Sequence, residues 1–372
     1  MKFVLLVLLS SLALSSPIAH AIDVTFLNPA KKGERFWDMV TETMVAASND
    51  FGMTLEVIYA DRSRGKMMRL GKEIANRANP PDYLILVNEE QSAETIFLET
   101  IGSDIKTLML LNDFTPIQQE RIEFAMSGNQ NLIGSVIPDN YSAGQRQMHA
   151  LHQCAKPLSD NKPIHMLAIG GDKVTPASIE RNLGVLSVIR KNDDIVLDRF
   201  LYANWSQEEA RRLTDSYIKW SMQTKIQATA IWAANDLIAI GAKQAIEANG
   251  LEAGTDICVV GLNWSLQGLN LVKSGHLVAT DGGHFLAGAW ALVALNDYHT
   301  RRDNSNKTPL GKIHFQMQSI DSTNVDQYLT KLGDENWSKI NFKGFELTSE
   351  QSYSDYDFSL QHVFAQIEPN HE

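Results

Sequence analysis

Apolar and polar positions alternate most clearly in the second half of the chain, where they predict a strand, a helix and a second strand. Residues 229–232 are an apolar run, apolar residues recur at helical spacing over 237–248, and residues 258–261 are rich in β-branched side chains. Such a β-α-β unit has parallel strands and a right-handed crossover. Asn235 and Asp236 follow the first strand, where a helix N-cap belongs and where open parallel sheets bind ligands.

The same alternation extends along most of the chain and predicts an α/β protein with doubly wound parallel sheets. Further strands are predicted at residues 23–27, 53–59, 83–87, 107–111, 132–137, 165–169, 198–201 and 277–281. Further helices are predicted at residues 36–47, 65–79, 92–101, 141–154, 178–190, 207–222, 268–275 and 284–298. Residues 112–116 and 300–311 read as loops, and the chain after residue 321 predicts a short helix at 325–329, a strand at 337–345 and a polar, acidic tail.

The run AxNDxxAxGAxxAxxxxG over residues 233–250, followed by VVG, resembles the C-terminal lobe of type I periplasmic binding proteins of the sugar-binding class. The likeness runs from Asp23 to about Ser319 and implies two doubly wound lobes joined by a three-strand hinge. It places the first lobe at residues 22–137 and 283–311, the second lobe at 138–282, and the hinge return with a C-terminal extension at 312–372. Lactose-repressor-like transcription factors share the motif in their effector domains.

Charge and the first residues favour an exported protein over a repressor. Lys2, an apolar stretch over residues 3–14 and the small residues Ala19 and Ala21 have the layout of a cleaved secretory signal, so residues 1–21 are expected to be removed. The formal net charge of −11 would repel nucleic acid. We therefore expect a soluble, monomeric protein of the periplasm, long enough at 372 residues for two lobes.

The two cysteines leave two alternatives open. Cys154 falls on a predicted helix and Cys258 on a predicted buried strand. In an oxidising compartment they could form a disulfide, or they could stay two buried, inert thiols. Neither has the spacing of a metal site, and we expect no cofactor.

The resemblance implies a ligand site between the lobes. Phe36 and Trp37 match the aromatic pair of the first lobe, and Trp205 matches the aromatic residue of the second, although one of the first pair could belong to the core. Arg181 matches an arginine whose rigid fork holds two ligand oxygens. Asn235 matches an asparagine that bonds the ligand, whereas Asp236 is expected to cap or support.

Three further polar residues could either contact the ligand or stabilise local structure. Asn28 and Asn88 follow predicted strands, where an asparagine can contact a ligand or cap its own loop. Asp139 stands at the first expected hinge crossing and could line the cleft.

Several positions depart from the sugar-binding pattern. The chain has Asn112-Asp113 where sugar binders carry Asp-Arg, Asn263 where they carry an aspartate, and Gly283 beside His284 where they carry a glutamine. An asparagine offers one acceptor and one donor group where an aspartate accepts two hydroxyl bonds, so ribose and galactose are not favoured. The LLNDFTP loop and the extension are similar to sensory members, such as the autoinducer-2 receptor and the periplasmic partner of the trimethylamine-oxide sensor kinase.

The motifs favour binding over catalysis. The chain has no HExxH, GxSxG or GxxxxGK motif, and His149 and His152 are spaced as on a solvated helix face. We therefore expect a binding protein that holds a small, sugar-like ligand between two lobes and delivers it to an ABC-type permease in the inner membrane. The alternative is a ligand-sensing partner of a membrane histidine kinase or diguanylate cyclase.

Overall fold

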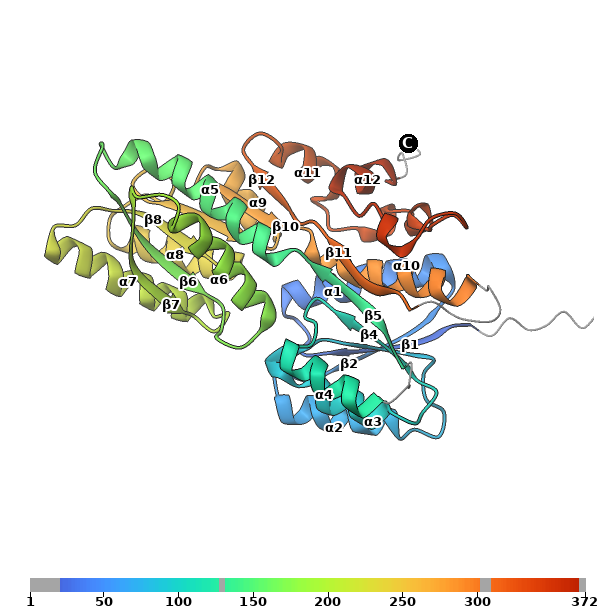
Figure 1. Ribbon diagram of the computed structural model, residues 1–372. Coiled ribbons are helices and arrows are strands. Elements are labelled where there is room, and N and C mark those ends of the chain that lie inside the picture. Colours follow the sequence, from blue (N-terminus) through green and yellow to red (C-terminus); the bar gives the residue numbers. More distant parts are fainter. Residues whose placement is uncertain (1–20, 127–130, 302–308, 368–372) are drawn as a thin grey trace, which may run out of the picture.

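The computed structural model describes residues 21–126, 131–301 and 309–367. Residues 1–20, most of the expected export signal, lie outside the described residues. The chain forms two lobes side by side, each with helices on both faces of a sheet that is parallel except for one edge strand of the second lobe, which confirms the predicted fold class (Figure 1). Among the described residues, no helix is both long and apolar enough to cross a membrane.

The first lobe contains a six-stranded parallel sheet with the order β2-β1-β3-β4-β5-β11. Its strands are β1 (Asp23–Asn28), β2 (Thr54–Tyr59), β3 (Tyr83–Leu86), β4 (Lys106–Leu110), β5 (Leu132–Pro138) and β11 (Gly311–Phe315). Its helices are α1 (Arg35–Phe51), α2 (Arg64–Ala75), α3 (Ala93–Thr100), α4 (Pro116–Met126) and α10 (Ala287–Thr300).

The second lobe contains a sheet with the order β7-β6-β8-β9-β10-β12, in which only β12 runs antiparallel. Its strands are β6 (Ile164–Gly170), β7 (Ile195–Tyr202), β8 (Ala228–Ala233), β9 (Cys258–Leu262), β10 (Ala279–Gly282) and β12 (Gln318–Asp321). Its helices are α5 (Asn140–Leu158), α6 (Pro176–Ile189), α7 (Gln207–Thr224), α8 (Asp236–Ala248) and α9 (Leu266–Lys273).

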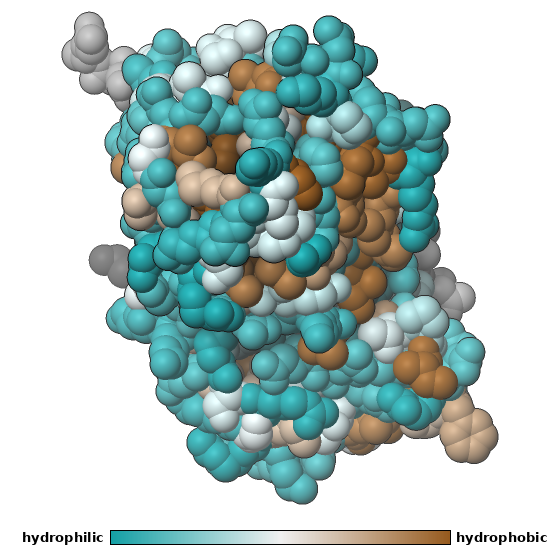
Figure 2. Space-filling model, turned by 90° about the vertical axis from the view of Figure 1, so that its left-hand side faces the viewer, coloured by the Kyte–Doolittle hydropathy of each residue, from teal (hydrophilic) through white to brown (hydrophobic). Residues whose placement is uncertain are grey.

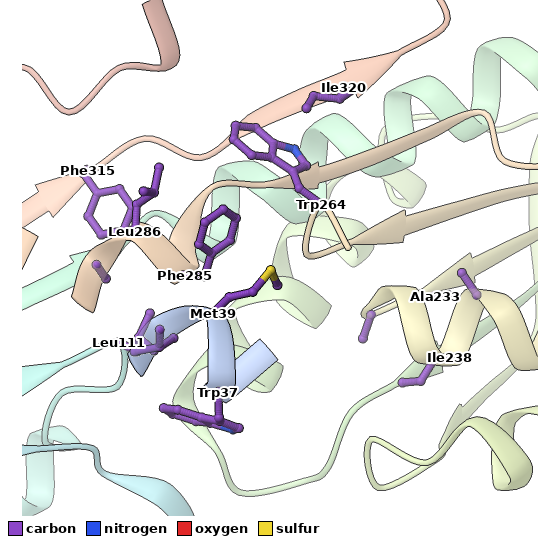
Figure 3. Packing of buried hydrophobic residues seen from close by; sticks show 14 of the residues in the cluster. Trp37, Met39, Leu111, Ala233, Ile238, Trp264, Phe285, Leu286, Phe315 and Ile320 are labelled. Atoms are coloured by element: carbon purple, nitrogen blue, oxygen red, sulfur yellow. The ribbon is translucent and has the colours of Figure 1, made fainter. Parts of the chain in front are cut away.

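The chain passes between the two sheets after β5, after β10 and between β11 and β12. The first and third passages lie together, because β11 pairs with β5 and the Asp139 N–H donates to the Phe315 carbonyl at 2.9 Å. Buried side chains of both lobes meet beside these passages, among them Met39, Trp264 and Phe285 (Figure 3). The ends of the strands that carry the binding loops are thereby held near one another.

Helix α4 lies where the hydrophobic pattern predicts no element. Its apolar residues do not share one helix face, since Ile122 is buried while Ile117 and Phe124 are exposed. Without an apolar stripe, the segment has no periodic signal that sets it apart from a loop. The face of the molecule in Figure 2 is mainly hydrophilic, with apolar side chains gathered in patches.

The chain after β12 is helical, and the strand predicted at residues 337–345 is wrong. Helix α11 (Val325–Leu332) covers the predicted helix, and two 3-10 turns follow at Trp337–Lys339 and Phe342–Phe345, before α12 (Leu360–Ala365). The Phe342 and Phe345 rings lie 5.9 and 4.6 Å from the Trp290 ring on α10. Phe342 and Phe345 are three residues apart in one 3-10 turn, so both rings face α10. In a strand, residues three apart would point to opposite faces.

Cys154 of α5 and Cys258 of β9 form a disulfide, so the alternative of two free thiols is wrong. Helix α5 packs across β8, β9 and β10, which brings the two Cα atoms to 6.1 Å although 104 residues separate them in sequence. The bond closes a long loop, and a loop of this length restricts the unfolded chain strongly.

Loss of this disulfide should lower the free energy of unfolding by about 2 to 4 kcal/mol. Urea unfolding monitored by tryptophan fluorescence, with and without a thiol reductant, measures the difference. The Cys154→Ser, Cys258→Ala double variant serves as the control, because its urea midpoint should be the same with and without the reductant. An equal urea midpoint for oxidised and reduced wild-type protein would contradict the expectation.

Candidate ligand-binding site

A cavity of about 1380 Å³ lies between the two lobes. It is lined by loops that follow β1 to β4 in the first lobe and β6 to β9 in the second, together with the first turns of α1, α6 and α8. Seven of the ten residues predicted to bind the ligand line it: Phe36, Trp37, Asn112, Arg181, Trp205, Asn235 and Asn263. The carboxyl ends of two parallel sheets thus face one shared space, as in other open α/β sheets that bind ligands there.

The loops around the cavity hold non-glycine residues in the left-handed backbone region. Arg62 follows β2 with φ of 57°, Glu90 follows β3 with φ of 46°, and Leu111 follows β4 with φ of 62°. In the second lobe, Trp205 follows β7 with φ of 60°. Such conformations cost about 1 to 3 kcal/mol each and persist where the surrounding structure enforces them, most often at functional sites.

Arg181 is a buried cation at the cavity wall with neutral hydrogen-bond partners. Its side chain donates from Nε to Asn140 Oδ1 at 2.9 Å, from Nη1 to the Ala234 carbonyl at 3.1 Å, and from Nη2 to His284 at 3.3 Å. The residue is only 3% exposed, and burial lowers the pKa of Arg181 to about 10. A buried guanidinium held by neutral groups favours additional electron-rich oxygens from a ligand.

His284 joins Arg181 to the aromatic wall of the first lobe. Its ring stacks on Phe36 at 4.6 Å, and Nε2 receives the N–H of Arg181. Burial, together with the neighbouring Arg181 charge, lowers the pKa of His284 well below its ordinary value, so the ring is neutral. Because an arginine can only donate, Nε2 is the acceptor and the ring proton lies on Nδ1. Sequence reasoning noted His284 beside Gly283 but did not include it in the site.

Trp205 forms the aromatic wall of the second lobe and is fixed by Asp172. The indole Nε1 donates to Asp172 Oδ2 at 2.7 Å, while Asp172 Oδ1 accepts the Thr175 N–H at 2.7 Å before α6. The ring lies so close to the backbone that a Cβ on Gly171 would come within 2.2 Å of it. The Arg181 guanidinium lies 6.0 Å from the centre of the Trp205 ring. A carboxylate, a glycine and a cation thus hold this ring in one place.

A charged cluster that sequence reasoning missed covers the first-lobe side of the cavity. Arg62 donates to Glu34 through Nε and Nη2 and to Glu89 through Nη1 at 2.6 Å, and its guanidinium lies 5.9 Å from the Trp37 ring. The Glu89 side chain is only 14% exposed. Burial raises the pKa of Glu89 to about 7, with Arg62 opposing the shift and Asp172 of the facing lobe adding to it. Close to neutral pH, this carboxyl can therefore accept or donate a hydrogen bond.

Three asparagines complete the polar part of the lining. Asn235 caps α8 by accepting the Ile238 N–H at 2.9 Å, and Asn112 reaches across the lobes to accept the Ala177 N–H at 2.9 Å. Within the described part of the chain, the side-chain NH2 groups of these two residues have no protein partner, and neither does the side chain of Asn263. Asp236 supports the loops by accepting from Ser265 and Thr280.

The structure places the other three predicted residues outside the cavity lining. Asn28 bonds Thr41 and the Ala30 N–H, and Asn88 bonds Gln118 and two backbone groups. Asp139 caps α5 by accepting from Ser142, and it also accepts from Gln316. Each side chain satisfies its own loop or helix end, which favours the local-structure alternative over ligand contact for Asn28, Asn88 and Asp139.

Two lobes, a hinge crossed three times and a cavity between facing strand ends define a two-lobed solute-binding protein of type I architecture. A family model described as "Periplasmic binding protein domain" matches residues 24–298, and the chain therefore belongs to this family. Members of this family are periplasmic binding proteins.

The similar proteins include sugar-binding members. A crystal structure of a periplasmic sugar-binding protein from Pseudomonas fluorescens is 31% identical with a TM-score of 0.80, covering 92% of this chain and 99% of that one. The arabinose-transporter binding protein of Shewanella sp. ANA-3, bound to L-arabinofuranose, has a TM-score of 0.71 over 84% of this chain and 96% of its own; at 16% identity it supports the fold alone.

A curated relative binds a sugar alcohol. The xylitol-binding protein of Mycolicibacterium smegmatis (strain ATCC 700084 / mc(2)155) is 26% identical over 242 residues, which are 64% of this chain and 64% of that protein. The chain thus spans slightly less than two thirds of this relative.

Replacing Glu89 with glutamine should stabilise the unliganded protein at pH 8 by about 1 to 3 kcal/mol and have little effect at pH 4.5. The folded protein raises the pKa of Glu89 from 4.5 to about 7, so this group lowers the stability of the fold as the pH rises from about 4.5 to 7, and the loss stays constant above that. Protonation restores that stability as the pH falls towards the ordinary value of 4.5, and glutamine mimics the protonated form.

Urea unfolding of both proteins between pH 4.5 and 8 measures this effect. The Glu123→Gln variant, at an exposed position on α4, controls for the loss of one negative charge. If wild type and Glu89→Gln were equally stable at pH 8, Glu89 would not be the buried carboxyl described here.

Proposed function

We propose that the protein captures one small sugar or polyol between its lobes, which close around the ligand. The observation that carries this proposal is Arg181, a buried cation at the cavity wall whose hydrogen-bond partners are all neutral. Ligand hydroxyl or ring oxygens would satisfy it without a second charge. In this proposal, residues 22–137 with 283–311 and residues 138–282 move as the two lobes.

The remaining lining supports the same class of ligand. The partly buried Phe36 and Trp205 rings can cover the C–H surface of a sugar, whereas Trp37, only 4% exposed, belongs mainly to the core. The amides of Asn112, Asn235 and Asn263 can bond the hydroxyls of the sugar. The relatives are described as binding xylitol, L-arabinofuranose, galactofuranose and myo-inositol. A polyol or a furanose is therefore the first choice over the pyranose forms of ribose and galactose.

The cavity is larger than a small sugar needs, although the lobes already touch where Asn112 accepts the Ala177 N–H. At about 1380 Å³ it exceeds the roughly 300 to 1000 Å³ of most ligand pockets. A ligand that contacts both lobes binds the closed form more tightly than the open form, and this difference in affinity sets how far it shifts the equilibrium towards closure. Closure would also bring Asp172 nearer to Glu89, so the ligand has to separate or bridge these carboxyls.

We propose that the protein is a monomer in the periplasm. In its closed form it binds an ABC-type importer in the inner membrane. The disulfide supports an oxidising compartment. A sensor kinase or cyclase is the alternative partner, suggested by the extension after residue 321. However, the Pseudomonas fluorescens sugar-binding protein matches 92% of this chain, and the unmatched 8% is shorter than the extension. At least part of the extension is therefore shared with a sugar-binding protein and does not by itself indicate a sensor.

A thermal-shift screen tests the ligand class. Protein from Ile22 onward is heated with xylitol, other pentitols, arabinose, galactofuranosides, myo-inositol and ribose. A ligand that binds only the folded state adds about 2.7 kcal/mol of stability at a hundredfold excess over its Kd. We expect a raised Tm with at least one polyol or furanose, and no shift with any of them would contradict the proposed ligand class.

Replacing Trp205 with alanine should weaken the binding of the polyol or furanose found in the screen by about 1.5 to 3 kcal/mol, the scale of one buried ring. Isothermal titration calorimetry measures the change in Kd. Trp220→Ala is the matched control, because Trp220 lies on α7 and stacks on Tyr217 away from the cavity lining. Unchanged affinity in Trp205→Ala would remove this ring from the site.

A further inference from the structure

The C-terminal segment, which we define as residues 322–367, begins on the second lobe. It follows β12, which pairs with β10. Helix α11 then packs against α9, where Lys273 and Asp326 form an ion pair at 2.7 Å. The Tyr328 ring lies 5.1 Å from the Trp264 ring in the loop after β9. The first part of the segment is therefore attached to the second lobe.

The rest of the same segment is attached to the first lobe. The Trp337 indole donates to Glu42 at 3.0 Å and the Phe342 N–H donates to Asp50 at 2.8 Å, both on α1. Further along, Phe358 stacks on Trp290 of α10 at 4.4 Å. The two parts also touch each other, since the Tyr328 ring of α11 lies 6.3 Å from Phe364 of α12. Figure 1 shows α11 beside the second lobe and α12 above α10.

The passage from one lobe to the other occurs at Gly333 to Glu335, and it reaches the binding cavity. Glu335 forms an ion pair with Arg35 at 3.1 Å, and both residues line the cavity. Arg35 directly precedes Phe36 and Trp37 on α1. The family model ends at residue 298, so Glu335 belongs to a part of the chain beyond the family domain.

We propose that the C-terminal segment is a fourth connection between the lobes, which restricts how far they open. Because each of its ends is packed on a different lobe, opening must stretch or break contacts that three hinge passages alone would leave free. Glu335 and Arg35 place this connection at the ligand-binding end of α1. The inference builds on the proposed closure of the lobes, but its test needs no ligand.

The test loosens the connection without removing its contacts. An insertion of about six glycine and serine residues between Gly333 and Asp334 adds roughly 13 Å of slack between the two packed parts. The control places the same insertion between Ser349 and Glu350, because the residues on both sides of that site bond Asp297 of the first lobe. Spin labels at Glu73→Cys on α2 and Glu208→Cys on α7, both well exposed, report the distance between the lobes.

We expect the insertion at residue 333 to broaden the inter-lobe distances of the unliganded protein towards longer values by about 5 Å or more. The control insertion should leave them as in the protein without an insertion. The Glu335→Ala variant removes the ion pair with Arg35 and leaves the Arg35–Glu42 pair within α1 in place. It should give a smaller change in the same direction, and it provides the measurement if the insertion impairs folding. Identical distances in the folded variants would overturn the proposal, whatever the ligand screen finds.

Discussion

The proposed ligand site depends on the hydrogen bonds of one buried group, the guanidinium of Arg181. It reaches Asn140 next to the first hinge passage, Ala234 at the end of β8 and His284 next to the second passage. His284 in turn stacks on Phe36 of the first lobe. A cation in such a place has lost its hydration, and neutral partners replace that hydration only in part. A ligand that supplies oxygens to Arg181 therefore gains more than it would from an arginine in water.

The loops that surround Arg181 are held under strain by rigid strands. Left-handed residues after β2, β3, β4 and β7 turn the chain sharply at the strand ends, so that ring faces and amides line the same cavity. The hydrophobic core continues through the hinge, where Trp264 packs against Phe285, and it joins the two lobes beside the cavity (Figure 3). Preorganised groups lose less freedom on binding, which raises affinity without further contacts.

Sequence patterns predicted most of the fold and the centre of the site, for physical reasons that also explain the failures. Buried parallel strands are continuous apolar runs, and the residues that follow them face the cavity, which is why Asn235 was a candidate. Trp205 was a candidate through the resemblance to sugar-binding proteins, and both residues line the cavity. The same reasoning predicted Asn28 and Asn88, whose side-chain oxygens accept backbone N–H groups of their own loops. The pairing of Arg62 with Glu89 joins two loops 27 residues apart and has no periodic signal.

The distribution of amide protection on ligand binding tests the central claim most directly. Hydrogen–deuterium exchange is measured with and without the polyol or furanose that raises the Tm. Binding between the lobes predicts slower exchange in both, around residues 33–39 of the first lobe and residues 172–181, 204–206 and 235–238 of the second. Protection confined to one lobe, or to a surface away from the cavity, would contradict capture of the ligand between the lobes.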